Sequence, residues 1–448
     1  MQNYLKLRSC LGTAVLLPLL GAALMSHSVD ASATNLFEAY QAARVNDSIY
    51  RAAFYANENG KENRILGRSG LLPSLAASYS NSRNRTDIFT DLSTSHPQYN
   101  SRNSTIQLRQ ALLSLDAIAR YKQGRAQADA SASQLDADGQ EMILRVVGAY
   151  IEAAFSNEQV ELSIAERDMY FEQRKLNDML FAKGEGTKTD MLEIQARLDL
   201  AEAKLLETKD NQKAAFTTLS AIMGREVTAV DRLRAEFQVR PLDKANFDTW
   251  KTSALAHNPE LSTQTYSIEV AHQEVNKARA GHTPRLDLIA SYSKSSSESI
   301  NTLNQDSTVR SIGIQLNIPL YSGGSVNAQT RQAVANEERT KADLQSKKDK
   351  VLLELRKDYD AATSSVARIA ALEKSVASGK LLIKATEQSI RGGVRITSDL
   401  LNAQQQLSVS QRDLAQSRYS YLVTSLRMRA AAGTLSADDV REVAGNFQ

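Results

Sequence analysis

Cysteine is almost absent from this sequence of 448 residues, where the only one is Cys10. It lies next to an apolar N-terminal segment, so the rest of the chain can form no disulfide, thiolate nucleophile or cysteine-ligated metal site. Proline is scarce as well, with 7 residues, and aromatic residues make up only 6%. Two stretches without proline, 98–240 and 320–448, are rich in Ala, Leu, Gln, Glu, Lys and Arg, which favours long helices.

An excess of charge of one sign is also missing. The 54 Lys and Arg residues nearly balance the 51 Asp and Glu residues, for a formal net charge of +3. Because phosphate binding needs a clear basic excess or stripe, we expect no nucleic acid partner. The 5 histidines show no metal-ligand spacing, and neither a nucleophile elbow nor a dinucleotide loop is found. The sequence therefore predicts no enzyme, no cofactor and no metal site.

Long apolar runs are limited to the N-terminus. Lys6 and Arg8 precede an apolar run over 11–25, and Ala31-Ser32-Ala33 forms a small-residue cleavage site. This pattern predicts a signal peptide over 1–33, with a retained membrane anchor as the alternative. No run of about 18 apolar residues follows, so any later contact with a membrane has to come from β-strands.

The chain contains two copies of one large unit. Gly184 and Gly393 are 209 residues apart. The same offset relates Asp190 to Asp399, Leu192 to Leu401, Gln195 to Gln404, Leu198 to Leu407 and Gly224 to Gly433. We therefore expect a first repeat over 34–224, a linker over 225–245, a second repeat over 246–433 and a C-terminal tail over 434–448.

Each repeat is predicted to run as helix, strand, polar loop, strand and long helices. Ile and Leu occupy every second position of 312–320, a clean period of two, and weaker alternation marks the other strands. Two strands are thus expected at about 73–113 and two at about 284–321, around polar loops at 81–98 and 294–307.

The long helices carry a heptad seam. Residues 194, 198, 201 and 205 continue to 222 in a period of 3.5, which predicts supercoiled helices, with an ordinary amphipathic helix as the alternative. Four strands per chain cannot close a membrane barrel, which takes about eight or more. Open strand edges cannot persist in lipid, so two or three chains together are expected to close one barrel. A soluble periplasmic coiled-coil scaffold with two small hairpins is the alternative.

Three segments carry a resemblance to a known family. They are Leu-Asn-Ile-Pro-Leu-Tyr-Ser-Gly-Gly at 316–324, Gly-Val-Arg-Ile-Thr-Ser-Asp-Leu-Leu-Asn-Ala at 393–403, and Arg-Tyr-Ser-Tyr-Leu at 418–422, which is followed by Ala-Gly-Thr-Leu at 432–435. With the duplication, they make the sequence resemble the TolC family of outer-membrane channels over nearly the whole chain after residue 33.

The resemblance implies a mixed, mostly α fold. Three chains would form a homotrimer with one twelve-stranded β-barrel in the outer membrane of a Gram-negative bacterium, continued by a periplasmic α-helical coiled-coil barrel. A periplasmic adaptor and an inner-membrane ABC or proton-driven pump are the implied partners. The missing lipidation cysteine makes the chain look more like members that serve type I protein secretion, with multidrug or small-molecule efflux as the alternative.

The resemblance also implies a closed entrance at the helical tips, near 184–190 and 392–399. Gly184 and Gly393 are the expected tip turns, because a tight turn favours residues that accept positive φ. Asp399 matches a carboxylate that rings the entrance. Asn402 stands at a second ring position that is acidic in the family, and this departure predicts a weaker ring.

A gate latch is implied as well. Arg395 matches a latch residue between neighbouring helices, and Asp190, preceded by Thr189, matches its partner. Ile390 replaces a tyrosine of the family's latch, which predicts a gate held less tightly or by different contacts. Helix capping by the pairs Thr189-Asp190 and Ser398-Asp399 is the structural alternative.

Overall fold

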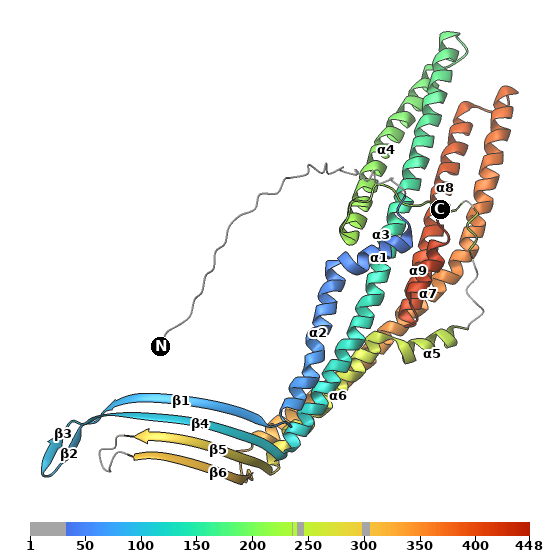
Figure 1. Cartoon of the computed structure of the whole chain (residues 1–448). Coiled ribbons are helices and arrows are strands. Elements are labelled where there is room, and N and C mark those ends of the chain that lie inside the picture. Colours follow the sequence, from blue (N-terminus) through green and yellow to red (C-terminus); the bar gives the residue numbers. More distant parts are fainter. Residues whose placement is uncertain (1–32, 235, 240–245, 298–304) are drawn as a thin grey trace, which may run out of the picture.

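The computed structural model describes residues 33–234, 236–239, 246–297 and 305–448. The predicted signal peptide and the linker residues 240–245 lie outside these ranges, apart from Ala33. A four-stranded sheet occupies one end, and long helices run away from it toward two separate helical tips (Figure 1). Among the described residues, no helix combines the length and the apolar character needed to cross a bilayer.

The two repeats follow the same order of elements. The first contains α1 (Leu36–Asn46), α2 (Ser48–Ser69), β1 (Ser74–Arg85), β2 (Ile88–Thr90), β3 (Ser93–Ser95), β4 (Gln98–Leu113), α3 (Leu115–Ala182) and α4 (Lys188–Met223). The second contains α5 (Phe247–His257), α6 (Pro259–Arg279), a short 3-10 helix (Ala280–His282), β5 (Arg285–Ser297), β6 (Gln305–Asn317), α7 (Ser325–Arg391) and α8 (Thr397–Ala431), and α9 (Ala437–Ala444) follows. The predicted duplication is confirmed.

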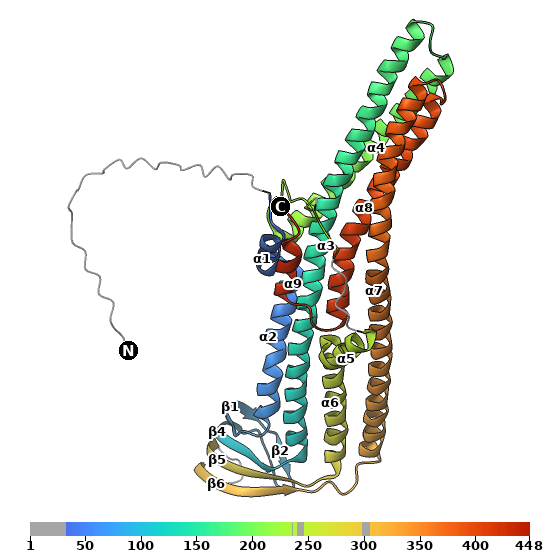
Figure 2. The same ribbon diagram turned by 90° about the vertical axis from the view of Figure 1, so that its right-hand side faces the viewer.

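Two very long helices set the shape of the molecule. α3 has 68 residues and α7 has 67, so each extends for about 100 Å at 1.5 Å per residue. Near the sheet they lie beside α2 and α6, and beyond the middle of the molecule they pair with α4 and α8 (Figure 2). Each helical tip is therefore the far end of one antiparallel helix pair, α3–α4 or α7–α8.

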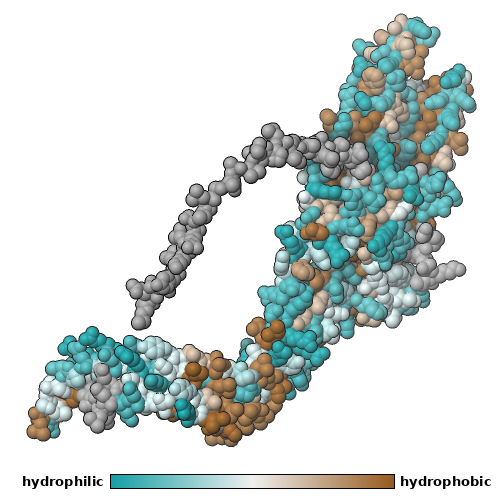
Figure 3. Space-filling view, viewed as in Figure 1, coloured by the Kyte–Doolittle hydropathy of each residue, from teal (hydrophilic) through white to brown (hydrophobic). Residues whose placement is uncertain are grey.

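The sheet is antiparallel, in the order β1-β4-β5-β6. Its register aligns Leu75, Leu108, Ala290 and Ile312 in one row across all four strands. This apolar face is exposed in the single chain, since Leu75 is 71% and Ile312 77% exposed. Apolar side chains gather on the part of the sheet next to the helices (Figure 3). The predicted period of two thus places an apolar band on one face of the sheet.

Polar groups gather on the other face. Asp287 of β5 is only 2% exposed, and its Oδ2 lies 2.6 Å from Arg109 Nη2 of β4 and 3.0 Å from Arg285 Nε. A buried carboxylate is retained in such a place when charged donors surround it. The two faces of the sheet therefore differ sharply in polarity.

Two details of the strand prediction were wrong. β6 ends at Asn317 rather than near 321, and Ile318 and Leu320 are exposed outside it. Pro319 explains this end, because proline cannot donate to the strand ladder. The segment 81–98, expected to be a polar loop, consists largely of the ends of β1 and β4 and of the small β2–β3 hairpin, in which Phe89 pairs with Thr94.

The heptad seam is buried as predicted. Ile194 and Leu219 are 0% exposed, and Leu198, Ala201 and Leu205 are also buried. The polar seam position, Gln212, donates from Nε2 to Asn157 Oδ1 of α3 at 2.7 Å. The small side chains in this seam allow α3 and α4 to pack closely as a pair.

The linker and the tail are part of the largest core, which the sequence analysis did not anticipate. Val227, Val230 and Phe237 of the linker and Val440 and Phe447 of the tail are buried there, against α1, α3 and α8. α9 is amphipathic, with buried residues at 440, 443 and 444, a helical spacing that indicates an apolar face.

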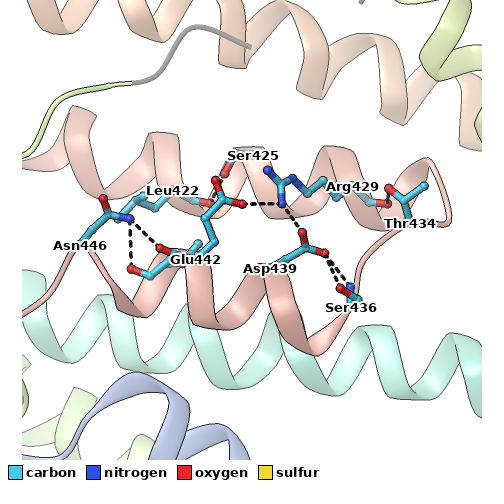
Figure 4. Close-up of polar contacts among 9 residues, drawn as sticks. Leu422, Ser425, Arg429, Thr434, Ser436, Asp439, Glu442 and Asn446 are labelled. Atoms are coloured by element: carbon cyan, nitrogen blue, oxygen red, sulfur yellow. Dashed lines mark hydrogen bonds and ion pairs between the residues drawn. The ribbon is translucent and has the colours of Figure 1, made fainter. Parts of the chain in front are cut away.

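Ionic contacts hold α9 on α8 (Figure 4). Arg429 of α8 pairs with Asp439, and its Nη1 lies 3.0 Å from Glu442 Oε2. Asp439 also accepts from the backbone N–H of Ser436 at 2.7 Å, which completes a capping box at the start of α9.

Candidate functional site at the helical tips

The two tip turns have the same backbone geometry. Gly184 has φ +80° and Gly393 has φ +72°, both in the left-handed region. In each turn the glycine N–H bonds to the carbonyl three residues earlier, and the next N–H bonds to the carbonyl five residues earlier, at 2.9–3.0 Å. This arrangement satisfies the last helical carbonyls and favours glycine. Each glycine thus lies where its helix pair reverses direction.

The acidic residues follow these turns at equivalent positions. Asp190 and Asp399 are each the third residue of a helix, where the positive end of the helix dipole favours a carboxylate. The capping alternative was wrong in detail. The N-cap of α4 is Thr187, whose Oγ1 accepts from the Asp190 N–H at 3.1 Å, and α8 has no side-chain cap at Ile396.

The two latch residues do not meet inside one chain. Arg395 is exposed in the turn before α8, and among the described residues it forms no ion pair with Asp190. Thr189 is exposed beside Asp190, and Ile390 is half-buried at the end of α7. The geometry of one chain leaves the Arg395 side chain available to a neighbouring chain.

Arg197 of α4 makes the polar link that the sequence analysis missed. Its Nη2 donates to Asn402 Oδ1 at 3.1 Å, and its Nη1 donates to Gln405 Oε1 at 3.0 Å, both on α8. Glu193, one turn earlier on α4, accepts from Arg197 Nη2 at 2.9 Å. We call this set of hydrogen bonds the Arg197 contact. It joins a helix of the first repeat to a helix of the second.

The Arg197 contact rests on a packed apolar base. Tyr170 of α3 is 3% exposed and packs with Ile194, Leu198 and Leu401. Burial alone would lower the pKa of Arg197, but its hydrogen bonds to Glu193 and Tyr170 raise that pKa above the usual value. Burial also raises the pKa of the Tyr170 phenol. The guanidinium therefore stays charged and the phenol stays neutral at ordinary pH, so the contact persists.

The Arg197 contact also changes the interpretation of Asn402. The sequence analysis placed Asn402 in a selectivity ring, where it offers a neutral oxygen. In the structure that oxygen already accepts from Arg197. In the sequence, the only sign of the Arg197 contact is the four-residue spacing of Glu193 and Arg197. That spacing predicts an ordinary ion pair on the surface of one helix and does not indicate a contact with Asn402.

Comparison with known proteins identifies the family. The sequence profile of the outer membrane efflux proteins matches residues 39–225 and 250–434, one match for each repeat. The chain therefore belongs to the outer membrane efflux protein family, the family that the sequence resembles. It is a channel protein of the Gram-negative outer membrane that extends into the periplasm, as predicted.

Individual relatives agree with this assignment. The chain is 41% identical to the alkaline protease secretion protein AprF of Pseudomonas aeruginosa, over 96% of this chain and 90% of that protein. It is 35% identical to the proteases secretion protein PrtF of Dickeya chrysanthemi, over 93% and 92%. The solved CmeC outer membrane channel of Campylobacter jejuni superposes with a TM-score of 0.79 at 18% identity, over 94% of this chain and 91% of that chain, and has the same fold.

Proposed function

We propose that this chain is the outer-membrane channel of a type I secretion system that exports a protein substrate, most simply a protease. The observation that carries the proposal is the similarity to AprF and PrtF over nearly the whole length of all three chains. Family members form trimeric channels that act with an adaptor and an inner-membrane pump. For this chain we propose an ABC transporter as the pump, on the basis of the same similarity to the two protease secretion proteins.

The proposed assembly is a homotrimer. One chain presents β1 and β6 as the two edges of its sheet. Pairing β1 of one chain with β6 of the next would close a twelve-stranded barrel and satisfy both edges, as a bilayer requires. The exposed apolar band around Leu75 and Ile312 supports a lipid-facing outer surface. A soluble scaffold would leave this band in water, so we favour the channel.

Export provides the test of this function. In cells that retain the adaptor and the transporter, deletion of this chain is expected to remove the protease from the culture medium, and the wild-type chain is expected to restore it. Gly393→Val should restore much less, because a β-branched residue disfavours the φ of +72° at the tip turn. Extracellular protease activity and the amount of trimer in the membrane are the two measurements.

A matched control separates the tip from general damage. Gly313→Val changes a strand position of β6 with open space around it, so export should stay near wild type. Full export by Gly393→Val would show that the tip turn is dispensable. Unchanged protease export after deletion of the chain, together with new drug sensitivity, would favour the efflux alternative.

The proposed gate includes a ring of Asp399 carboxylates, one from each chain, around the threefold axis. Such a ring selects cations and holds a multivalent cation well. In planar bilayers we expect a trivalent cation to block conductance from the periplasmic side, and Asp399→Ala to lose most of that block. Equal block of the wild type and Asp399→Ala would remove Asp399 from the ring.

The Arg197 contact sharpens the experiment on Asn402. Asn402→Asp should strengthen the block only slightly, because Arg197 would compensate the new carboxylate at 3.1 Å. Adding Arg197→Gln should release that carboxylate and strengthen the block further. If the single and double variants are blocked equally, Arg197 does not control the charge at position 402.

A further inference from the structure

Four exposed basic side chains form a diagonal row on the part of the sheet that lies away from the helices. They are Arg83 of β1, Arg102 of β4, Lys294 of β5 and Arg310 of β6. The strand register places all four on the same face as Leu75 and Ile312. From Arg310 to Arg83, each residue stands one strand over and two residues farther from the helices. We call these four residues the basic row.

The apolar band ends just before the basic row on every strand. Going away from the helices, the last apolar or aromatic residues on this face are Tyr79, Ile106, Tyr292 and Ile312. The basic row follows two residues later on β5 and β6, and four residues later on β1 and β4. Strands of membrane barrels tilt by about 35–45°, so a line at one depth in the bilayer crosses the sheet diagonally. The basic row therefore runs along the edge of the apolar band, parallel to the membrane surface.

The opposite face of the sheet has a different character. Hydroxyl groups bond there across the strands, with Ser291 Oγ 2.7 Å from Ser311 Oγ and Thr105 Oγ1 3.1 Å from Ser293 Oγ. Within the described strands, its charged residues lie next to the helices and are Arg109, Arg285 and Asp287. A surface of hydroxyl groups suits a water-filled channel, so the basic row lies on the lipid side of the sheet.

The positive charge of the basic row is largely uncompensated. Among the described residues its members form no ion pair, and Arg310 only covers the Tyr292 ring, at 5.6 Å from the centroid. Asp306 is the single acidic residue on this face of the four described strands. Diagonal neighbours on a sheet are about 7–8 Å apart, within reach of long side chains. Two members of the row can therefore bind one phosphate group together, as arginine and lysine commonly do.

We propose that the basic row binds the headgroup phosphates of a lipid in the outer leaflet of the outer membrane. The helices extend into the periplasm, so the far end of the sheet lies toward the cell exterior (Figure 1). There the acyl chains contact the apolar band while the phosphates contact the row. Clusters of Lys and Arg beside a membrane attract anionic headgroups in this way. The inference rests on the proposed barrel and is independent of the secreted substrate.

Three probes test the proposal on the detergent-solubilised full-length trimer. Lipid A carries acyl chains and phosphates, dephosphorylated lipid A carries the same chains alone, and inorganic phosphate has no chains. Native mass spectrometry counts the bound molecules and gives their apparent affinities. We expect one strong lipid A site per chain and much weaker binding of the other two probes. Added salt should weaken lipid A binding, because it screens exposed charges.

Variants of the channel locate the binding. Arg102→Gln combined with Lys294→Gln should weaken lipid A binding about thirtyfold, since each basic residue beside a charged headgroup contributes about fivefold. Arg102→Lys combined with Lys294→Arg keeps both charges and should bind nearly like the wild type. Lys209→Gln combined with Lys213→Gln removes the same charge from exposed positions of α4 and should leave lipid A binding intact.

The outcomes separate the lipid site from the barrel. Equal binding of the two lipids to the wild-type trimer, or lipid A binding that survives the double glutamine change in the row, would overturn the lipid site alone. Inorganic phosphate that binds as tightly as lipid A would assign the row to a free anion instead. A wild-type chain that forms no trimer would overturn the barrel and this inference with it, and the mass of the complex reports that result separately.

Discussion

Gly124→Ala is expected to destabilise the folded chain, although alanine is the better helix former. A Cβ at position 124 of α3 would lie 2.2 Å from the Asn63 carbonyl oxygen and 3.3 Å from Gly67 Cα, both on α2. Gly67 faces α3 in the same way, because a Cβ at this position would lie 2.6 Å from the Arg120 carbonyl oxygen. The two helices thus meet backbone to backbone, and a methyl group has to push them apart. Overpacking of this kind costs about 1–3 kcal/mol.

Gly148→Ala is the matched control on the same helix. A Cβ there meets nothing within 4 Å, so the change should stabilise α3 by up to about 1 kcal/mol through helix propensity. The two alanine variants are therefore expected to shift the unfolding midpoint of the purified channel in opposite directions. Shifts of the same sign and size would mean that the α2–α3 contact relaxes at little cost.

Arg197→Ala is expected to raise channel conductance by removing the Arg197 contact between α4 and α8. One hydrogen bond contributes a net stabilisation of about 0.5–1.5 kcal/mol. Because the Arg197 contact is partly exposed, its stabilisation of the closed state lies at the lower end of this range. In a trimer the three copies act on one closed–open equilibrium, which gives a shift of about tenfold or more. Single-channel recording in planar bilayers measures the open fraction.

Two comparisons make this experiment specific. In the part of the chain that the structure describes, Arg174 pairs with Asp178 of its own helix at 3.7 Å and with no other acidic residue, so Arg174→Ala should conduct like the wild type. Arg395→Ser tests the proposed latch to Asp190 of a neighbouring chain. Because the two arginines lie in different contacts, their effects on opening should add. If Arg197→Ala and Arg174→Ala show the same conductance, the Arg197 contact is not part of the gate.

The features that the sequence predicted well are local or periodic. Alternation at 312–316 and the heptad seam through Ile194 and Leu198 determine which face of each element is apolar. The seam is buried between helices, whereas the apolar face of the sheet is exposed in the single chain. The duplication could be recognised from the sequence alone, because identical residues recur at a constant offset. For the same reason the order of helices and strands in each repeat was correct, since each element carries its own signal.

The features that were missed depend on distant partners. Arg197 and Asn402 are 205 residues apart, and nothing near either position in the sequence indicates that they meet. The linker and the tail are short, so their few apolar residues give no period, yet Leu233 pairs with Phe447 in the core. Capping was misplaced because Thr187 and Thr189 are both plausible caps and only backbone geometry distinguishes them.

The matching tip turns have a consequence for the stoichiometry of the whole machine. In the proposed trimer, six turns with one backbone geometry would stand in a ring, three after Gly184 and three after Gly393. Their side chains differ, since the position of Arg395 in the second repeat is occupied by Gly186 in the first. An adaptor that recognises the backbone turn alone would find six equivalent binding sites on each trimeric channel. An adaptor that binds Arg395 would find only three equivalent sites. The number of adaptor chains per channel therefore shows whether the adaptor recognises the backbone turn or the arginine.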